Sequence, residues 1–160
     1  MSITYENGVF ALDTRRTSYI FRVTKFRHLE HIHYGEHVEI SDAQPLASKH
    51  DIQLGSSVMY DTTDDNYCLD NLCLEWSGVG RGDYHKTPVE AKMPDGSFSS
   101  DFLYESHEIV PGCVPMQSLP TAYDDEKTAQ TLIISMRERD RDAACLLYTS
   151  PSPRDRSLSR

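Results

Sequence analysis

The sequence predicts an all-β fold of short antiparallel strands joined by turns and long loops. Apolar and polar residues alternate with period two in several runs, and turn-forming residues recur about every ten residues. No segment shows a sustained helical period, and residues 126–130 could form one helical turn at most. This combination is typical of a β-sandwich or a β-barrel.

The N-terminal quarter predicts four strands. Ile3–Tyr5 and Val9–Leu12 flank an Asn-Gly turn at Asn7-Gly8, which is a strong signal for a hairpin between strand-forming residues. Tyr19–Val23 alternates so that its aromatic and apolar side chains share one face, and Leu29–Tyr34 ends at a glycine. These runs therefore predict four strands, the first two joined as a hairpin.

The middle of the chain differs from both ends. Ser41–Asp65 has no period and predicts a long loop, a feature that in a compact domain is usually functional or disordered. Leu72–Glu90 holds the only tryptophan, Trp76, and has glycine at every second position from Gly78 to Gly82. Such glycines let the backbone bend sharply or approach another group closely. That group could be a neighbouring subunit, a ligand or another strand.

The C-terminal half predicts further strands. Val89–Met93 and Phe98–Tyr104 flank Pro94–Ser97, whose proline and glycine favour a hairpin turn. Glu105–Val110 should continue the second of these strands. Thr131–Arg137 predicts a last strand with three apolar side chains on one face.

The last segment, residues 145–160, differs abruptly from the acidic chain before it. Its first eleven residues, Cys145–Asp155, match codon for codon the translation of a transposase adapter used in short-read sequencing libraries. We therefore expect 1–144 to be a natural domain fragment and 145–160 to be an artefactual, disordered tail. The tail carries three Arg and one Asp, so the formal charge of −9 becomes −11 for residues 1–144.

Composition excludes several classes of function. The negative charge argues against binding nucleic acid or an anionic membrane surface, because an acidic chain cannot neutralise the negative charge of either partner. No apolar run approaches the length that spans a membrane, and the first residues show no signal-peptide pattern. The four cysteines form neither a dense disulfide framework nor a metal-binding pair, which favours a cytoplasmic location.

Candidate metal sites are weak. His28, His31, His33 and His37 cluster, and His31-x-His33 would place two imidazoles on one strand face. No third ligand is evident nearby, however, and half-exposed strand histidines are common. The acidic stretch from Asp61 to Asp65 lacks the glycine and the glutamate of a calcium loop. We therefore expect no metal site.

Candidate catalytic or adhesive motifs are equally weak. Arg81-Gly82-Asp83 is the tripeptide that cell-adhesion receptors recognise, but it arises readily by chance. Cys68 and Cys73 lack an activating environment in the sequence. Paired carboxylates such as Asp64-Asp65 and Asp124–Glu126 lie in polar loops, where nothing would raise a carboxyl pKa for acid–base catalysis. We expect no catalytic residue in this chain.

An ordered set of short motifs nevertheless resembles one family. The set resembles the N-terminal domain of bacterial α-galactosidases (melibiases) of glycoside hydrolase family 36 and covers essentially all of residues 1–144. Its members are Leu29–Gly35, Cys68–Asp70, Leu74–Trp76, Gly80–Tyr84, Pro88–Glu90, Pro94–Ser97, the run from Asp101 to His107 and Leu119–Tyr123.

The resemblance implies a fold and a function for the parent protein. The fold would be part of an N-terminal β-supersandwich, followed in the parent by a (β/α)₈ barrel and a C-terminal β-domain. The activity would be retaining hydrolysis of terminal α-galactosides such as melibiose and raffinose, by two aspartates and without a cofactor. Both aspartates would follow residue 144, so the fragment would be inactive. Family members are commonly homotetramers.

The resemblance also implies one substrate-binding residue. Asp51, in the long aperiodic loop, matches an aspartate that reaches the active site of a neighbouring subunit, where a carboxylate can accept two hydrogen bonds from a sugar diol. A solvated loop acid is the plain alternative. The competing function is a free-standing carbohydrate-binding β-sandwich module, which would need exposed aromatic side chains on one face.

Overall fold

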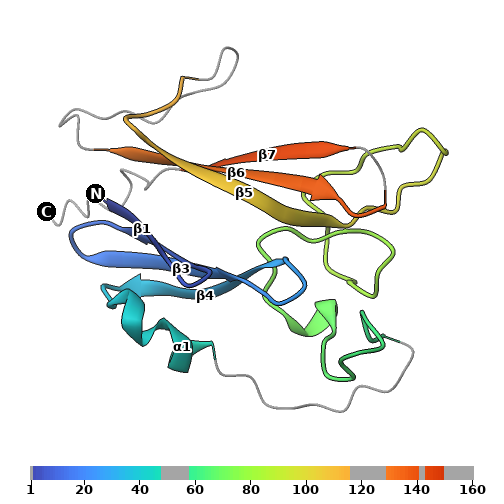
Figure 1. Ribbon diagram of the computed structural model, residues 1–160, viewed down its shortest axis with the longest axis horizontal. Helices are drawn as coiled ribbons and strands as arrows, with labels where there is room; N and C mark the ends of the chain where they lie inside the picture. The colour runs from blue at the N-terminus through green and yellow to red at the C-terminus, as the bar shows by residue number, and fades with distance from the viewer. Residues whose placement is uncertain (1, 48–57, 116–128, 141–142, 150–160) are drawn as a thin grey trace, which may run out of the picture.

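The computed structural model describes residues 2–47, 58–115, 129–140 and 143–149 of the chain. Two antiparallel sheets lie face to face (Figure 1). The first has the order β1-β2-β3-β4 and the second the order β5-β6-β7. The strands are β1 (Ser2–Glu6), β2 (Val9–Asp13), β3 (Thr17–Val23), β4 (Leu29–Glu36), β5 (Phe102–Pro111), β6 (Gln130–Glu138) and β7 (Ala144–Thr149). The predicted all-β sandwich is confirmed.

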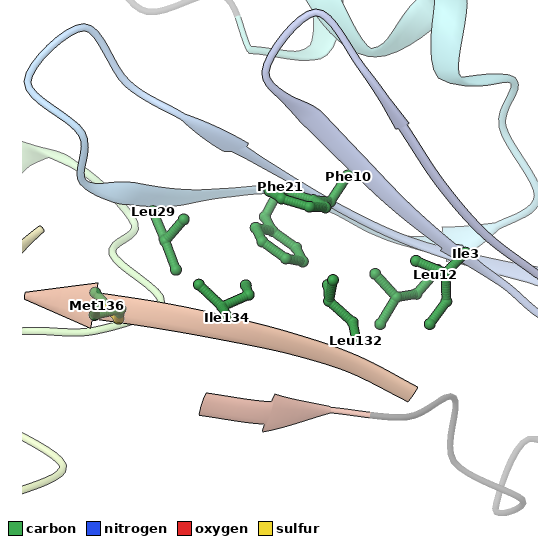
Figure 2. Close-up of a cluster of buried hydrophobic side chains, with 8 residues drawn as sticks. All are labelled: Ile3, Phe10, Leu12, Phe21, Leu29, Leu132, Ile134 and Met136. Atoms are coloured by element: carbon green, nitrogen blue, oxygen red, sulfur yellow. The ribbon is translucent and has the colours of Figure 1, made fainter. Parts of the chain in front are cut away.

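The core lies between the two sheets (Figure 2). Side chains from all four strands of the first sheet face three side chains of β6, as the alternation in both predicted. Leu132, Ile134 and Met136 are each at most 1% exposed. The members of this core cluster are Ile3, Phe10, Leu12, Phe21, Leu29, Leu132, Ile134 and Met136.

The opposite face of the first sheet is covered in part by a short helical segment. A 3₁₀ turn (Ile40–Asp42) leads into the single-turn helix α1 (Ala43–Leu46), and Ala43 packs against Ala11 and Ile20 of the sheet. The expectation of a loop over Ser41–Asp65 was therefore wrong at residues 41–46. The apolar residues there are too few to show a helical period, and burial against the sheet stabilises the turn.

The first hairpin forms as its turn residues predicted. Asn7 and Gly8 both adopt positive φ, 49° and 83°, and Glu6 pairs with Val9 across the two-residue turn. Both residues at positive φ are the signature of a type I′ turn, whose twist matches that of the flanking strands. β2, β3 and β4 then follow as antiparallel neighbours.

The predicted hairpin around Pro94–Ser97 was wrong in part. The turn itself forms, with Gly96 N and Met93 O 2.9 Å apart, but Val89–Met93 is not a strand and Val89 is 46% exposed. Ser100 instead makes an isolated bridge with Val79, and β5 begins at Phe102 and pairs with β6. The partner of β5 is therefore β6, which is distant in sequence, and not the adjacent segment Val89–Met93 that the local pattern predicted.

Part of the C-terminal tail is ordered. Ala144–Thr149 forms β7 on the open edge of β6, and Cys145 and Leu147 pack against the core cluster. Disorder was therefore wrong for these residues, while 150–160 lie outside the described residues. A sheet edge offers unpaired N–H and C=O groups to any strand-forming segment, so pairing does not depend on a segment's origin. The adapter origin and the domain boundary at residue 144 stay predictions.

The Leu72–Glu90 stretch lies close to other backbone, as its glycines predicted. A Cβ on Gly78 would lie 2.3 Å from Ser100 O, and Gly80 and Gly82 have φ of 93° and 80°. The partner of this bend is therefore another segment of the same chain. Trp76 packs against the core cluster, with its ring 6.1 Å from that of Phe102.

Within the part of the chain described, no helix has the length and apolar character needed to cross a membrane.

Candidate functional site around Glu75

An open groove of about 640 Å³ brings together polar side chains from three segments of the chain. β3 and β4 contribute one residue each, and residues 72–86 contribute the others. The lining residues are Tyr19, His31, Leu72, Cys73, Leu74, Glu75, Ser77, His85 and Lys86. We call this hollow the Glu75 groove.

Backbone hydrogen bonds position the groove's central segment beside β4. His31 N donates to Cys73 O at 2.7 Å, and Glu75 N donates to Leu29 O at 2.9 Å. Glu30 and Leu74 form an antiparallel bridge between the two segments. Residues 73–75 thus act as a short additional strand beside β4, and all three line the groove.

Glu75 is held in a defined orientation. The hydroxyl of Tyr19 donates to its carboxylate, with distances of 2.7 and 2.6 Å to Oε1 and Oε2. His31 Nδ1 lies 3.1 Å from Oε1. Burial raises the pKa of Tyr19, and the hydrogen bond to Glu75 and its charge raise it further. The phenol therefore stays a donor at physiological pH, and the carboxylate stays fixed.

A compact acid–histidine cluster lies next to the groove. His85 Nδ1 is 2.8 Å from Asp83 Oδ1 and 3.6 Å from Asp70 Oδ1. The three ligand-type atoms lie within 4.8 Å of one another. Asp83 also accepts hydrogen bonds from the backbone N–H groups of Gly78 and His85, at 3.2 and 3.0 Å. Through these hydrogen bonds the cluster stabilises a tight loop.

The same contacts explain the Arg-Gly-Asp tripeptide. The Asp83 side chain is fully buried, and Arg81 pairs with Asp140. Gly82 has positive φ and lies against the backbone of Val58. An adhesion receptor needs an exposed aspartate, so the tripeptide serves the loop instead of a receptor.

The four N-terminal histidines do not converge. A register shift between Ile20 and Phe21 places His31 opposite Phe21 and His33 opposite Ile20, so the two imidazoles face opposite sides of the sheet. The prediction that they share one face was therefore wrong. His33 Nε2 bonds to Glu36 O at 3.0 Å, and His37 Nδ1 lies 3.0 Å from Ser18 Oγ.

A buried polar network, which the sequence did not reveal, ties the segment at residues 60–67 to the sheets. His28 is 3% exposed, and its Nδ1 and Nε2 lie 2.9 Å from Tyr67 Oη and 3.0 Å from Asp101 Oδ1. Tyr60 donates to Asp101 Oδ2 at 2.6 Å. Burial alone would raise the pKa of Asp101, but the hydrogen bonds from His28 and Tyr60 outweigh it and hold that pKa below its usual value. The partners lie too far apart in sequence to form a local motif.

The remaining candidate residues are two acidic stretches, two cysteines and Asp51. Asp61 accepts from Thr63 N at 2.9 Å, and Asp64 pairs with Lys25, so this acidic stretch forms a turn. Cys68 is buried, whereas Cys73 is exposed on the groove. Asp51 and Asp124–Glu126 lie outside the described residues.

Comparison with known proteins agrees with the fold. The chain matches the "Glycosyl hydrolase family 36 N-terminal domain" over residues 27–154. The bifunctional alpha-galactosidase/sucrose kinase AgaSK of Mediterraneibacter gnavus is 32% identical over 142 residues, which is 88% of this chain and 15% of that protein. Alpha-galactosidase 1 of Pediococcus pentosaceus is 29% identical over 135 residues, which is 84% of this chain and 18% of that protein.

Solved structures show the same relation. The alpha-galactosidase from Lactobacillus brevis superposes with a TM-score of 0.84 at 25% identity, over 96% of this chain and 21% of that one. The galactosidase domain of AgaSK gives 0.81 at 30% identity, over 93% and 21%. The chain thus spans about a fifth or less of the length of these relatives. Since the family match covers most of its length, the chain belongs to the glycosyl hydrolase family 36 N-terminal domain family.

Proposed function

We propose that this chain is the non-catalytic N-terminal β-sandwich domain of a retaining α-galactosidase that hydrolyses terminal α-galactosides of the melibiose and raffinose type. The family match over residues 27–154 carries the proposal, and every relative named above is an alpha-galactosidase or contains one. A related structure from Geobacillus stearothermophilus was solved in complex with raffinose. Melibiase activity and a role in carbohydrate metabolism follow from this proposal.

Catalysis would belong to the part of the parent enzyme beyond this chain. A retaining glycosidase uses two carboxyl groups about 5–5.5 Å apart, one as nucleophile and one as acid and base. Among the described carboxylates, Asp83 and Asp101 are engaged in structural contacts, and Glu75 lines an open groove. The domain would therefore support an active site without contributing its nucleophile or its acid.

Asp51 is the one substrate contact that we propose for the domain. Its loop would reach the active site of a neighbouring subunit, which requires the parent enzyme to be a homo-oligomer such as a tetramer. Replacement of Asp51 by Ala in the assembled parent should raise KM for raffinose more than it lowers kcat, because a ground-state contact is lost.

We also propose a cytoplasmic location, because the four cysteines form no disulfide framework and the first residues show no signal-peptide pattern. Cell fractionation tests this location.

The decisive experiment is recovery of the coding sequence downstream of residue 144 without adapter. We expect a (β/α)₈ barrel with two catalytic aspartates, and the full-length enzyme should release galactose from raffinose while residues 1–144 alone should not. A reading frame that ends near residue 145, or a full-length protein without this activity, would overturn the proposal.

A further inference from the structure

We propose that the Glu75 groove is a binding site for a neutral saccharide. The groove's volume of about 640 Å³ lies within the range of small-molecule sites. The catalytic proposal assigns it no role. Its lining, the fixed carboxylate at its centre and its charge each point to a polyhydroxylated, uncharged ligand.

The lining supplies the mixture of groups that a sugar requires. Sugar hydroxyls both donate and accept, so their site needs acceptors and donors facing one space, next to some apolar surface. Glu75 offers an acceptor, and the ammonium of Lys86 offers donors. Leu72 and Leu74 supply apolar surface within the same lining.

Glu75 keeps acceptor capacity for one incoming hydroxyl group. Tyr19 and His31 account for three contacts to its two oxygens, whereas an ionised carboxylate has about four acceptor sites. The Glu75 side chain keeps 18% of its surface exposed, so an incoming hydroxyl can reach it. Because the orientation is set before binding, a ligand would not have to order this side chain.

Charge selects against other ligands. The lining holds one carboxylate, of Glu75, and one ammonium, of Lys86, and the carboxylates of Asp70 and Asp83 lie next to it around His85. A phosphate would meet these carboxylates, and a divalent cation would meet Lys86. A neutral saccharide faces neither cost. Beside the groove, the ring of Tyr34 lies 5.9 Å from that of Tyr19 and is 61% exposed, which offers a surface for the apolar face of a sugar.

The test is a titration of the 160-residue chain with methyl α-galactopyranoside, followed by amide chemical shifts. The choice of a galactoside rests on the proposed function. We expect saturable shifts at millimolar ligand, centred on residues 73–77 and 85–86. Glu75→Gln and Lys86→Ala should each weaken binding about tenfold, the size expected for a lost hydrogen bond to a charged group. Glu108→Gln, at an exposed position on β5, is the matched control and should bind as the unsubstituted chain does.

Lys86 is exposed, so its variant keeps the test valid if Glu75→Gln disturbs the fold. The inference is overturned if shifts do not saturate, if they centre elsewhere, or if a folded Lys86→Ala chain binds unchanged. If the chain binds no sugar, the proposal that the parent enzyme is an α-galactosidase still stands, because the raffinose assay tests it separately. Conversely, sugar binding by this chain would survive a downstream sequence that lacks the barrel.

Discussion

Gly78→Ala should destabilise the domain although it adds only one methyl group. The new Cβ would lie 2.3 Å from Ser100 O and 3.3 Å from Ser100 C, whereas ordinary contact begins at 3.4 Å. Both are backbone atoms, so no side chain can rotate away. Ser100 N also donates to Val79 O at 3.0 Å, which holds the two segments together at this point. The substitution must therefore push the segments apart by about 1.1 Å, the difference between 3.4 and 2.3 Å.

The expected cost combines two effects. Overpacking that displaces backbone costs about 1–3 kcal/mol, and a strained or lost Val79–Ser100 hydrogen bond adds about 1 kcal/mol. We expect the free energy of unfolding to fall by about 3 kcal/mol. The displacement would also reach Asp101, whose Cα would lie 3.8 Å from the added methyl group and whose side chain holds the buried network.

The assay is urea unfolding followed by the fluorescence of Trp76, two residues before the substitution. Gly96→Ala is the control, because Gly96 has φ of 83° but nothing within 4 Å of an added Cβ. That variant carries only the conformational cost of a left-handed residue, about 1 kcal/mol. If Gly78→Ala unfolds at the same urea concentration as the unsubstituted chain or as Gly96→Ala, the steric argument is wrong.

Three further substitutions test the core, the buried network and the loop. Ile134→Ala, at a fully buried position, should cost about 2–5 kcal/mol in urea unfolding, and a cost near zero would mean that the two sheets do not share this core. Asp101→Asn should cost about 3 kcal/mol at neutral pH. Because the folded-state pKa of Asp101 is lowered, its charge stabilises the fold above the unfolded pKa of about 4, and the difference between the two chains should shrink as pH falls below that value; a constant difference would refute the pairing. Asp83→Ala should speed amide exchange at Gly78 and His85, whose N–H groups it binds, and unchanged exchange would contradict its role in the loop.

Strand existence was predictable wherever alternation was strong. β2, β3 and β6 each carry apolar side chains at every second position, and the Asn7-Gly8 turn has only one favourable hairpin geometry. Val89–Met93 alternates as well, yet it forms no strand. Alternation shows that a segment could form a strand, but an available partner decides whether it does.

The candidate site was predictable only in part. The glycine spacing in Leu72–Glu90 indicated close backbone approach, which the structure shows at Gly78. Nothing local joined Glu75 to Tyr19, which are 56 residues apart, or His28 to Asp101, which are 73 apart. The register shift between β3 and β4 that separates His31 from His33 is likewise invisible in a pattern of period two.

The sequence by itself determined the all-β class, the first hairpin, the apolar face of β6 and, through an ordered set of motifs, the family. These features depend on local geometry, because side-chain period and turn chemistry act over a few residues. Only the tertiary structure decided which strand pairs with which, that Asp83 is buried, and that Tyr19, His31 and Glu75 meet in one groove. Those outcomes depend on contacts between segments far apart in the chain, and their energies become defined only once both segments are in place.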